Sequence, residues 1–208
     1  SSFGAMHPGG TQIYFVGDPK DHMVIIDSGE PYRAWTRQIL DYHAELGKPR
    51  ISAILITHGH GDHIASYREM KSSTGKDAGI HKEDAHNLLP DKPDFYLNEG
   101  DVIEVGTIEL YVMHTPGHTP GGLCLLTGKH LFSGDTLFPG GPGKTRSPEA
   151  LQQVIDSITK KLLVLPDDTA VYPGHGDDTT IGKAREEYQV FASKPRDPAL
   201  FGDVAWLG

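Results

Sequence analysis

The sequence predicts an α+β fold in which two layers of β-sheet are covered by helices. Short apolar segments alternate along the chain with stretches of helical spacing, and turns rich in Gly and Pro separate them. Neither an internal repeat nor a low-complexity linker interrupts this order. Because the apolar side of a sheet or helix must be buried against another element, the mixture favours sheet packed on sheet with helices outside.

The predicted strands are short runs of β-branched and apolar residues bounded by turn residues. Several of them pair as hairpins, around Gly17 to Asp21, around Gly106-Thr107 and around Gly128-Lys129. The strands are expected at Gln12–Gly17, Met23–Asp27, Ile51–Thr57, Val102–Val105, Ile108–His114, Leu123–Leu126, His130–Ser133 and Ala170–Tyr172.

The predicted helices have apolar residues near helical spacing and recognisable ends. Trp35, Ile39 and Leu40 follow this spacing in the first helix, which Gly47 ends. Ser147 is the expected N-cap of a later helix, with Pro148 in its first turn. Helices are expected at Pro31–Leu46, Ile64–Ser73, Lys82–Leu89, Pro148–Leu163 and Ile181–Ala192.

The length and composition predict a single domain over residues 1–208. The chain has 208 residues, of which 37% are hydrophobic and 23% charged, an ordinary balance for a globular protein. We expect a flexible N-terminus over about residues 1–10 and a C-terminal tail over 193–208. The tail is rich in apolar residues and could cap a pocket or join a dimer, but packing on its own domain is favoured.

The charge and the single cysteine indicate a cytoplasmic protein without a nucleic-acid or membrane partner. The net charge of -9 argues against nonspecific binding to nucleic acid. No apolar run approaches the ~20 residues that span a bilayer, and no secretory signal is visible. Cys124 lies in an apolar run, which predicts a buried thiol rather than a nucleophile. We expect a monomer or a homodimer.

Ligand-type side chains are concentrated in one segment, His58-Gly59-His60-Gly61-Asp62-His63. His58 and His60 directly follow a predicted strand, and their spacing of two places both imidazoles on one side of the chain. Asp62 and His63 follow where a helix should begin, so they face a second point. Four ligand-type residues in six positions therefore suit a pair of metal ions better than a single ion.

Further candidate ligands lie later in the chain, each beside a glycine after an apolar strand. They are His118, Asp135 and His175. A lone histidine in such a place is usually structural, but the combination with the 58–63 segment is specific. The sequence therefore predicts a site for two divalent metal ions, with zinc expected and iron or manganese as alternatives.

The ligand types in this set determine the chemistry that we expect. Neutral imidazoles leave positive charge on a metal ion, and carboxylates offset part of it. A coordinated water then loses a proton near pH 7, whereas bulk water has a pKa of 15.7. Such a hydroxide attacks an acyl or phosphoryl centre, so the cluster predicts a hydrolase.

These residues resemble the metallo-β-lactamase-fold superfamily, and within it the glyoxalase II (hydroxyacylglutathione hydrolase) branch. The resemblance runs from Gly10 to Gly176 and implies a four-layer αββα sandwich with the site at one edge of both sheets. It assigns His58, His60 and His118 to the first metal. It assigns Asp62, His63 and His175 to the second, with Asp135 bridging and Asp62 also orienting the hydroxide.

The resemblance also implies a small acyl or thioester substrate with an anionic group. Lys144 follows a Gly-rich loop, at the position where such hydrolases contact the glutathione carboxylate, and Arg146 is close by. The chain departs from the branch here. Thr145 stands where the long forms carry an aromatic residue, many short relatives have Arg-Thr-Asp at this point, and little follows His175 of the long forms' helical C-terminal domain.

Other activities use the same ligand set. Persulfide dioxygenases look very similar and bind one iron through the equivalents of His58, His118 and Asp135. A lactonase or β-lactamase would open its ring with the same hydroxide. Nuclease relatives usually add large RNA-binding regions that are not visible here, and a binding module without catalysis would have little reason to keep an open two-metal site.

Overall fold

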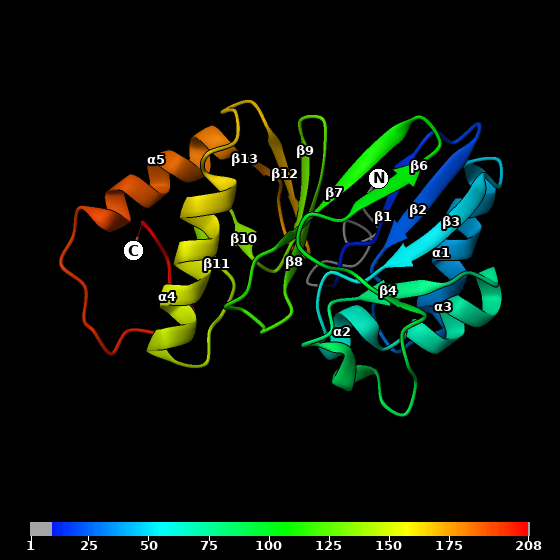
Figure 1. The fold of residues 1–208 in the computed structure, drawn as a ribbon, viewed down its shortest axis with the longest axis horizontal. Coiled ribbons are helices and arrows are strands. Elements are labelled where there is room, and N and C mark those ends of the chain that lie inside the picture. Colours follow the sequence, from blue (N-terminus) through cyan, green and yellow to red (C-terminus); the bar gives the residue numbers. More distant parts are fainter. Residues whose placement is uncertain (1–9, 208) are drawn as a thin grey trace.

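Two β-sheets pack face to face, and each is covered on its outer face by helices (Figure 1). The computed structural model describes residues 10–207. The order of layers confirms the predicted αββα sandwich. The predicted flexible N-terminus, about residues 1–10, lies outside the described residues except for Gly10.

The first sheet has five strands in the order of the sequence. β1 and β2 form the predicted antiparallel hairpin, and the following strands join in parallel. The sheet contains β1 (Tyr14–Gly17), β2 (His22–Ile26), β3 (Arg50–Leu55), β4 (Ala78–Ile80) and β5 (Phe95–Tyr96). β4 and β5 were not predicted, because strands of two or three residues are too short to show a period.

The second sheet has six strands in the order β13-β12-β9-β8-β7-β6. All neighbours are antiparallel except the parallel pair β9 and β12. Its strands are β6 (Val102–Val105), β7 (Ile108–His114), β8 (Leu123–Thr127), β9 (His130–Gly134), β12 (Ala170–Pro173) and β13 (Thr179–Thr180). A short extra hairpin pairs β10 (Leu137–Phe138) with β11 (Gly141–Pro142).

The helices divide between the two outer faces (Figure 1). The first face carries α1 (Arg33–Glu45), α2 (Gly61–Ile64), α3 (Tyr67–Thr74) and the 3₁₀ turn η2 (Ala85–Leu88). The second carries α4 (Pro148–Ser157), the π-helical turn η3 (Ile158–Leu162) and α5 (Ile181–Ala192). Within residues 10–207, no helix has the length and apolar character needed to cross a membrane.

The alternation of side chains along β2 builds two cores at once. Met23 and Ile25 pack outward against the α1 and α3 side chains, which include Trp35. Val24 and Ile26 pack inward with the second sheet. This period of two is the geometry of a strand buried on both faces. At about 25 cal/mol per Å² of buried apolar surface, such burial is the main stabilising contribution to the sandwich.

Three predicted helices differ from their observed form. The expected short helix Lys82–Leu89 is only the 3₁₀ turn η2. The expected helix Ile64–Ser73 is two helices, α2 and α3, since Ile64 forms a bridge to Gly29 and the Ser66 hydroxyl donates to the Glu30 carbonyl oxygen. These contacts with a distant loop interrupt the helix. The expected helix Pro148–Leu163 keeps its Ser147 cap but becomes a π-helical turn after residue 157.

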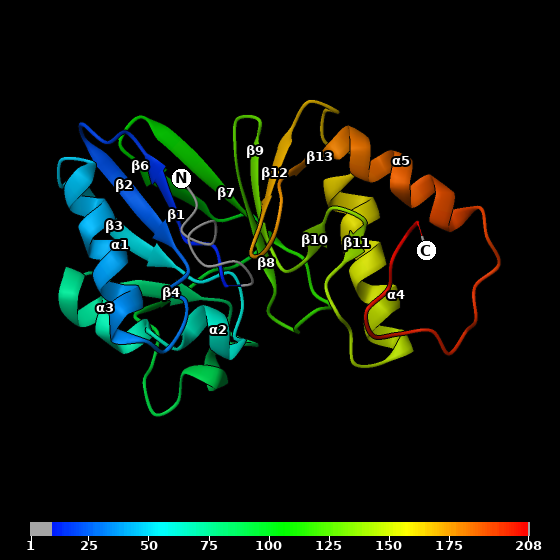
Figure 2. The same ribbon diagram turned by 180° about the vertical axis from the view of Figure 1, so that it is seen from behind.

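The C-terminal tail packs on the second helical face, as the sequence favoured. Trp206 is 1% exposed and lies with Phe191 and Val204 in the core beneath α4 and α5. Its backbone N–H donates to the Gly140 carbonyl oxygen at 2.8 Å. Figure 2 shows this last segment running beside β11 and α4. Cys124 is fully buried in the same core, and burial raises the pKa of its thiol to about 11, which fits a structural residue.

Candidate metal centre

The residues predicted as ligands come together at one edge of the two sheets. His58 and His60 follow β3, and Asp62 and His63 lie on α2. The other three follow strands of the second sheet. Their ligand atoms form three overlapping groups, each within 4.8 Å: His58, His60 and His118; His58, His63 and Asp135; and Asp62, His63 and His175.

Asp135 lies at the centre of this arrangement. Its Oδ2 atom is 3.5 Å from Nε2 of both His118 and His175, and 3.9 Å from Nε2 of His58. Its Oδ1 atom is 3.3 Å from His63 Nε2. Burial would raise the pKa of Asp135, but His63 and His58 lower it well below its usual range. One ionised carboxylate thus reaches both halves of the cluster.

Asp62 belongs to the half of the cluster that faces His175. Its Oδ2 atom is 2.9 Å from His175 Nε2 and accepts a hydrogen bond from Thr11 Oγ1 at 3.2 Å. Burial opposes its ionisation, but the His175 contact outweighs it and lowers the pKa of Asp62 to about 2. Asp62 is therefore an ionised acceptor at neutral pH.

Hydrogen bonds hold the imidazole rings by their Nδ1 atoms and turn Nε2 inward. The Nδ1 partners are Thr57 Oγ1 for His58 at 3.1 Å, Asp27 Oδ2 for His63 at 2.8 Å, and the carbonyl oxygens of Lys144 for His118 at 2.8 Å and of Gly10 for His175 at 3.1 Å. A carbonyl or carboxylate oxygen can only accept, and the Thr57 hydroxyl already donates its proton to Asp27, so Nδ1 carries the proton in each ring. In the neutral rings of His58 and His118, Nε2 then has a free lone pair, the tautomer that a metal ligand needs. Nearby carboxylates raise the pKa of His63 and of His175 against the effect of burial, so these two rings would release the Nε2 proton when a metal ion binds.

Several buried atoms inside the cluster have no hydrogen-bond partner. Nε2 of His58, Nε2 of His118 and Oδ1 of Asp135 are buried without a hydrogen-bond partner. Burial also lowers the pKa of His58 and of His118, so both rings are neutral at pH 7. Unpaired buried acceptors cost about 1–3 kcal/mol each. A bound cation removes that cost, so the donor set fits a metal ion.

Two glycines leave the space that the cluster occupies. A side chain at Gly174 would clash with the Asp135 carboxylate and the His63 ring. A side chain at Gly143 would clash with the Asp135 backbone and with His118. Close approach to the cluster thus explains Gly174, which precedes the predicted ligand His175, and Gly143 in the Gly-rich loop.

Sequence reasoning missed two buried carboxylates that support the ligands. Asp27 accepts hydrogen bonds from Thr57 N at 2.7 Å and Thr57 Oγ1 at 2.8 Å besides contacting His63. Asp84 accepts from Gly59 N through Oδ2 and from Gly121 N through Oδ1, each at 2.8 Å. Asp27 could have been found, because it ends an apolar strand as Asp135 does, but nothing marked Asp84.

The two predicted substrate-binding cations lie at different cavities. Lys144 lines a cavity of about 410 Å³ with His118 and Asp135, and its Nζ is 3.3 Å from Asp203 Oδ2. Arg146 lines a second cavity of about 300 Å³ with His60 and His118. Both cavities therefore lie beside the cluster, and His118 lines both of them.

A family model settles which group of proteins shares this arrangement. The model described as the metallo-beta-lactamase superfamily matches residues 7–175. The chain belongs to this superfamily. For a metallo-beta-lactamase fold, the His and Asp cluster implies binding of a divalent metal ion, and the superfamily likeness makes the protein an enzyme.

Particular members of the superfamily are similar over most of the chain. Hydroxyacylglutathione hydrolase GloC of Haemophilus influenzae is 31% identical over 199 residues, covering 86% of this chain and 92% of that protein. ETHE1 from Myxococcus xanthus matches with a TM-score of 0.76 and 29% identity, covering 90% and 82%. BLEG-1, a B3 metallo-beta-lactamase, matches with a TM-score of 0.73 and 28% identity, covering 85% and 91%.

Proposed function

We propose that the protein is a dinuclear metallohydrolase that cleaves thioesters of a small anionic thiol, as a glyoxalase II does. The observation that carries the proposal is the inward convergence of imidazole Nε2 atoms around the Asp135 carboxylate, with buried atoms there unpaired. The likeness to hydroxyacylglutathione hydrolases supports the substrate class.

The overlapping groups support a division of ligands between two ions. His58, His60 and His118 would hold one, and Asp62, His63 and His175 would hold the other. Asp135 would contact both, because its two oxygens lie near imidazoles of each group. Zinc is our first expectation, with iron or manganese as alternatives, since imidazole and carboxylate ligands suit all of them.

The chain's own residues prepare the reaction. When bound, the metal ions would supply hydroxide at neutral pH and polarise the substrate carbonyl oxygen. Asp62, ionised and held by Thr11, would accept a hydrogen bond from the attacking water and orient it. A thiolate leaves readily without a separate general acid, and the sequence shows no obvious motif for one. Lys144 and Arg146 are the cations available for the anionic part of the substrate.

The test compares Asp135→Ala and the wild type for metal content and for activity on a panel of thioesters, lactones and β-lactams. We expect the wild type to hold two ions per chain and to prefer thioesters. Asp135→Ala should lose metal and more than about 100-fold in kcat/KM together, since even residues behind the ligands cost 10–100-fold. Full activity in this variant would refute the bridging role, and preference for another ring or ester class would refute the substrate class.

A mononuclear iron persulfide dioxygenase is the second candidate. The observation in its favour is that the unpaired Nε2 atoms belong to His58 and His118, both facing Asp135, which is the ligand set of those enzymes. His175 and Asp62, by contrast, already contact each other at 2.9 Å.

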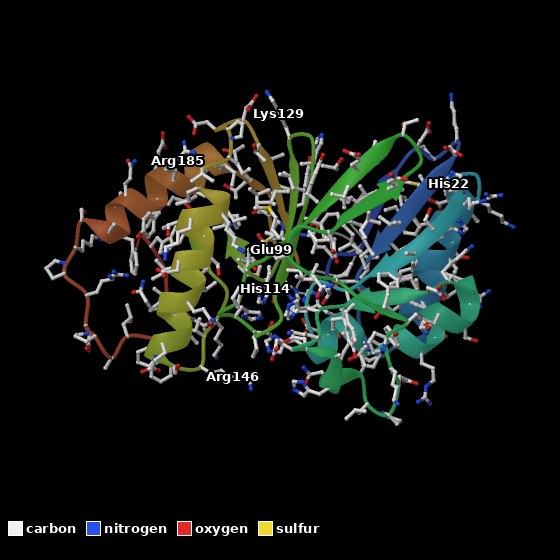
Figure 3. The ribbon with its side chains drawn as sticks, viewed as in Figure 1. His22, Glu99, His114, Lys129, Arg146 and Arg185 are labelled. Carbon is white, nitrogen blue, oxygen red and sulfur yellow. The ribbon has the colours of Figure 1, made fainter. Side chains whose placement is uncertain are left out.

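His175→Asn separates the two candidates, because it alters only the second group. The dinuclear proposal expects one ion fewer per chain and loss of thioester hydrolysis. The dioxygenase expects one iron, with oxygen consumption on glutathione persulfide retained. His22→Asn is the matched control, since His22 lies at the start of β2, far from the cluster (Figure 3). Cytoplasmic location, a monomer or homodimer, and a single domain stay predictions.

A further inference from the structure

The second cavity, which we call the Arg146 cavity, shares His60 and His118 with the candidate metal centre. Its remaining wall comes from both halves of the molecule, with Asn87 of η2 on one side and, on the other, Arg146 just before α4 and Gln153 within α4. Figure 3 shows Arg146 beside the lower end of α4. A group held in this cavity would therefore lie next to the metal centre.

The charges in the Arg146 cavity favour an anion. Its only carboxylate among residues 10–207 is Asp84, whose two oxygens already accept the N–H groups of Gly59 and Gly121. Arg146 lines the cavity and forms no ion pair with any carboxylate of residues 10–207. The amides of Asn87 and Gln153 add neutral donors.

The helix α4 adds to the same potential. It has ten residues, is capped by Ser147 and begins beside the cavity, which Ala150 also lines. The N-terminal end of a helix carries a partial positive charge. Glu149 in the first turn offsets part of this charge, so Arg146 is the main source of positive potential on this wall.

Lys144 is in a different position. Its ammonium lies 3.3 Å from the Asp203 carboxylate, and both groups are largely exposed, at 68% and 79%. Although such an exposed pair contributes little to stability, it places a negative charge beside Lys144. An anion at Lys144 would also approach Asp203, whereas an anion at Arg146 would not.

We propose that the Arg146 cavity is an anion-binding subsite that holds a negatively charged group of the thiol portion of the substrate. The inference rests on the proposed thioesterase function and departs from the family pattern, which assigns this contact to Lys144. A guanidinium donates two parallel hydrogen bonds to a carboxylate or a phosphate, so either group fits. A volume of about 300 Å³ is at the small end of ligand pockets and suits part of a substrate.

The experiment measures KM for an S-acylglutathione, an acyl-coenzyme A and a neutral S-acyl-N-acetylcysteamine on enzyme of quantified metal content. In Arg146→Gln the ratio of the KM for S-acylglutathione to that for the neutral thioester should rise about tenfold, which corresponds to about 1.4 kcal/mol. Lys144→Gln should change the same ratio less than about threefold, and Arg146→Lys should restore part of it. Arg37→Gln on the exposed face of α1 is the control for the change in net charge.

Binding of the non-hydrolysable S-hexylglutathione, measured by calorimetry, tests the subsite without turnover. Weaker binding in Arg146→Gln than in Lys144→Gln supports the proposal, and the reverse order overturns it. A tenfold effect confined to the coenzyme A thioester identifies phosphate rather than carboxylate as the anion. If the wild type cleaves no thioester, the proposed function fails, while the calorimetric comparison still decides the subsite.

Discussion

Replacement of Asp27 by Asn tests whether a carboxylate behind the ligands fixes the centre. Asp27 is 1% exposed and contacts His63 Nδ1 at 2.8 Å. Burial opposes protonation of His63, but Asp27 and Asp135 raise its pKa well above the ordinary value. In Asp27→Asn an oxygen can still accept from Thr57 N, yet an amide N–H then faces the proton on His63 Nδ1. One buried hydrogen bond to a charged group is lost, which should lower the free energy of unfolding by about 1.5–3 kcal/mol.

The same change disturbs the tautomer of His63. If the proton moves to Nε2, the lone pair directed at the cluster is lost, so metal affinity should fall about 10–100-fold. Urea unfolding of chelator-treated protein measures the stability, and titration against a competing chelator measures the affinity. Asp41→Asn, on the exposed face of α1, is the control. An Asp27→Asn protein with the wild-type urea midpoint and metal affinity would refute this reasoning.

The remaining predictions concern the core and the metal. Trp206→Ala should lower the unfolding free energy by about 3–5 kcal/mol, and Trp206→Phe by less, because the buried Nε1 atom has no hydrogen-bond partner; thermal unfolding measures both. Gly174→Ala should reduce metal content without unfolding the chain; equal metal content by elemental analysis would contradict the predicted clash. A metal ion at 100 times its Kd should add about 2.7 kcal/mol to the free energy of unfolding. A chelator should therefore lower the melting temperature, and adding the metal again should restore it. Burial raises the pKa of Cys124 to about 11 from 9.0. The preference of the folded state for the protonated thiol therefore adds its full stabilisation below pH 9, and this contribution is lost as the pH rises to 11. Urea midpoints should therefore fall more in the wild type than in Cys124→Ala between pH 8 and pH 10.5.

The layers of the fold were predictable because alternation is visible in strands of four residues or more. β2 buries apolar side chains on both faces, and the sequence shows them as one continuous apolar run. β10, β11 and β13 have two residues each, too few for any period, and depend on their neighbours for pairing. The break between α2 and α3 depends on Gly29 and Glu30, which are remote in sequence.

The convergence of the candidate ligands was predictable because strand ends bring residues together at one edge of a sheet. Asp84 could not be found in this way, since its role comes from two backbone N–H groups, of Gly59 and Gly121, that carry no signal in the sequence. The separation of Lys144 and Arg146 was equally hidden. Nearness along the chain does not give the direction of a side chain, and Asp203 is remote in sequence from Lys144.

Asp84 also couples the position of the metal ligands to the relative position of the two sheets. The Gly59 loop extends from the first sheet and the Gly121 loop from the second, and one short side chain ties them together. If the sheets slid by an ångström, one of these bonds would have to break. Substitutions deep between the sheets, such as Leu125→Ala, should therefore alter metal affinity from a distance, by shifting the two loops relative to each other.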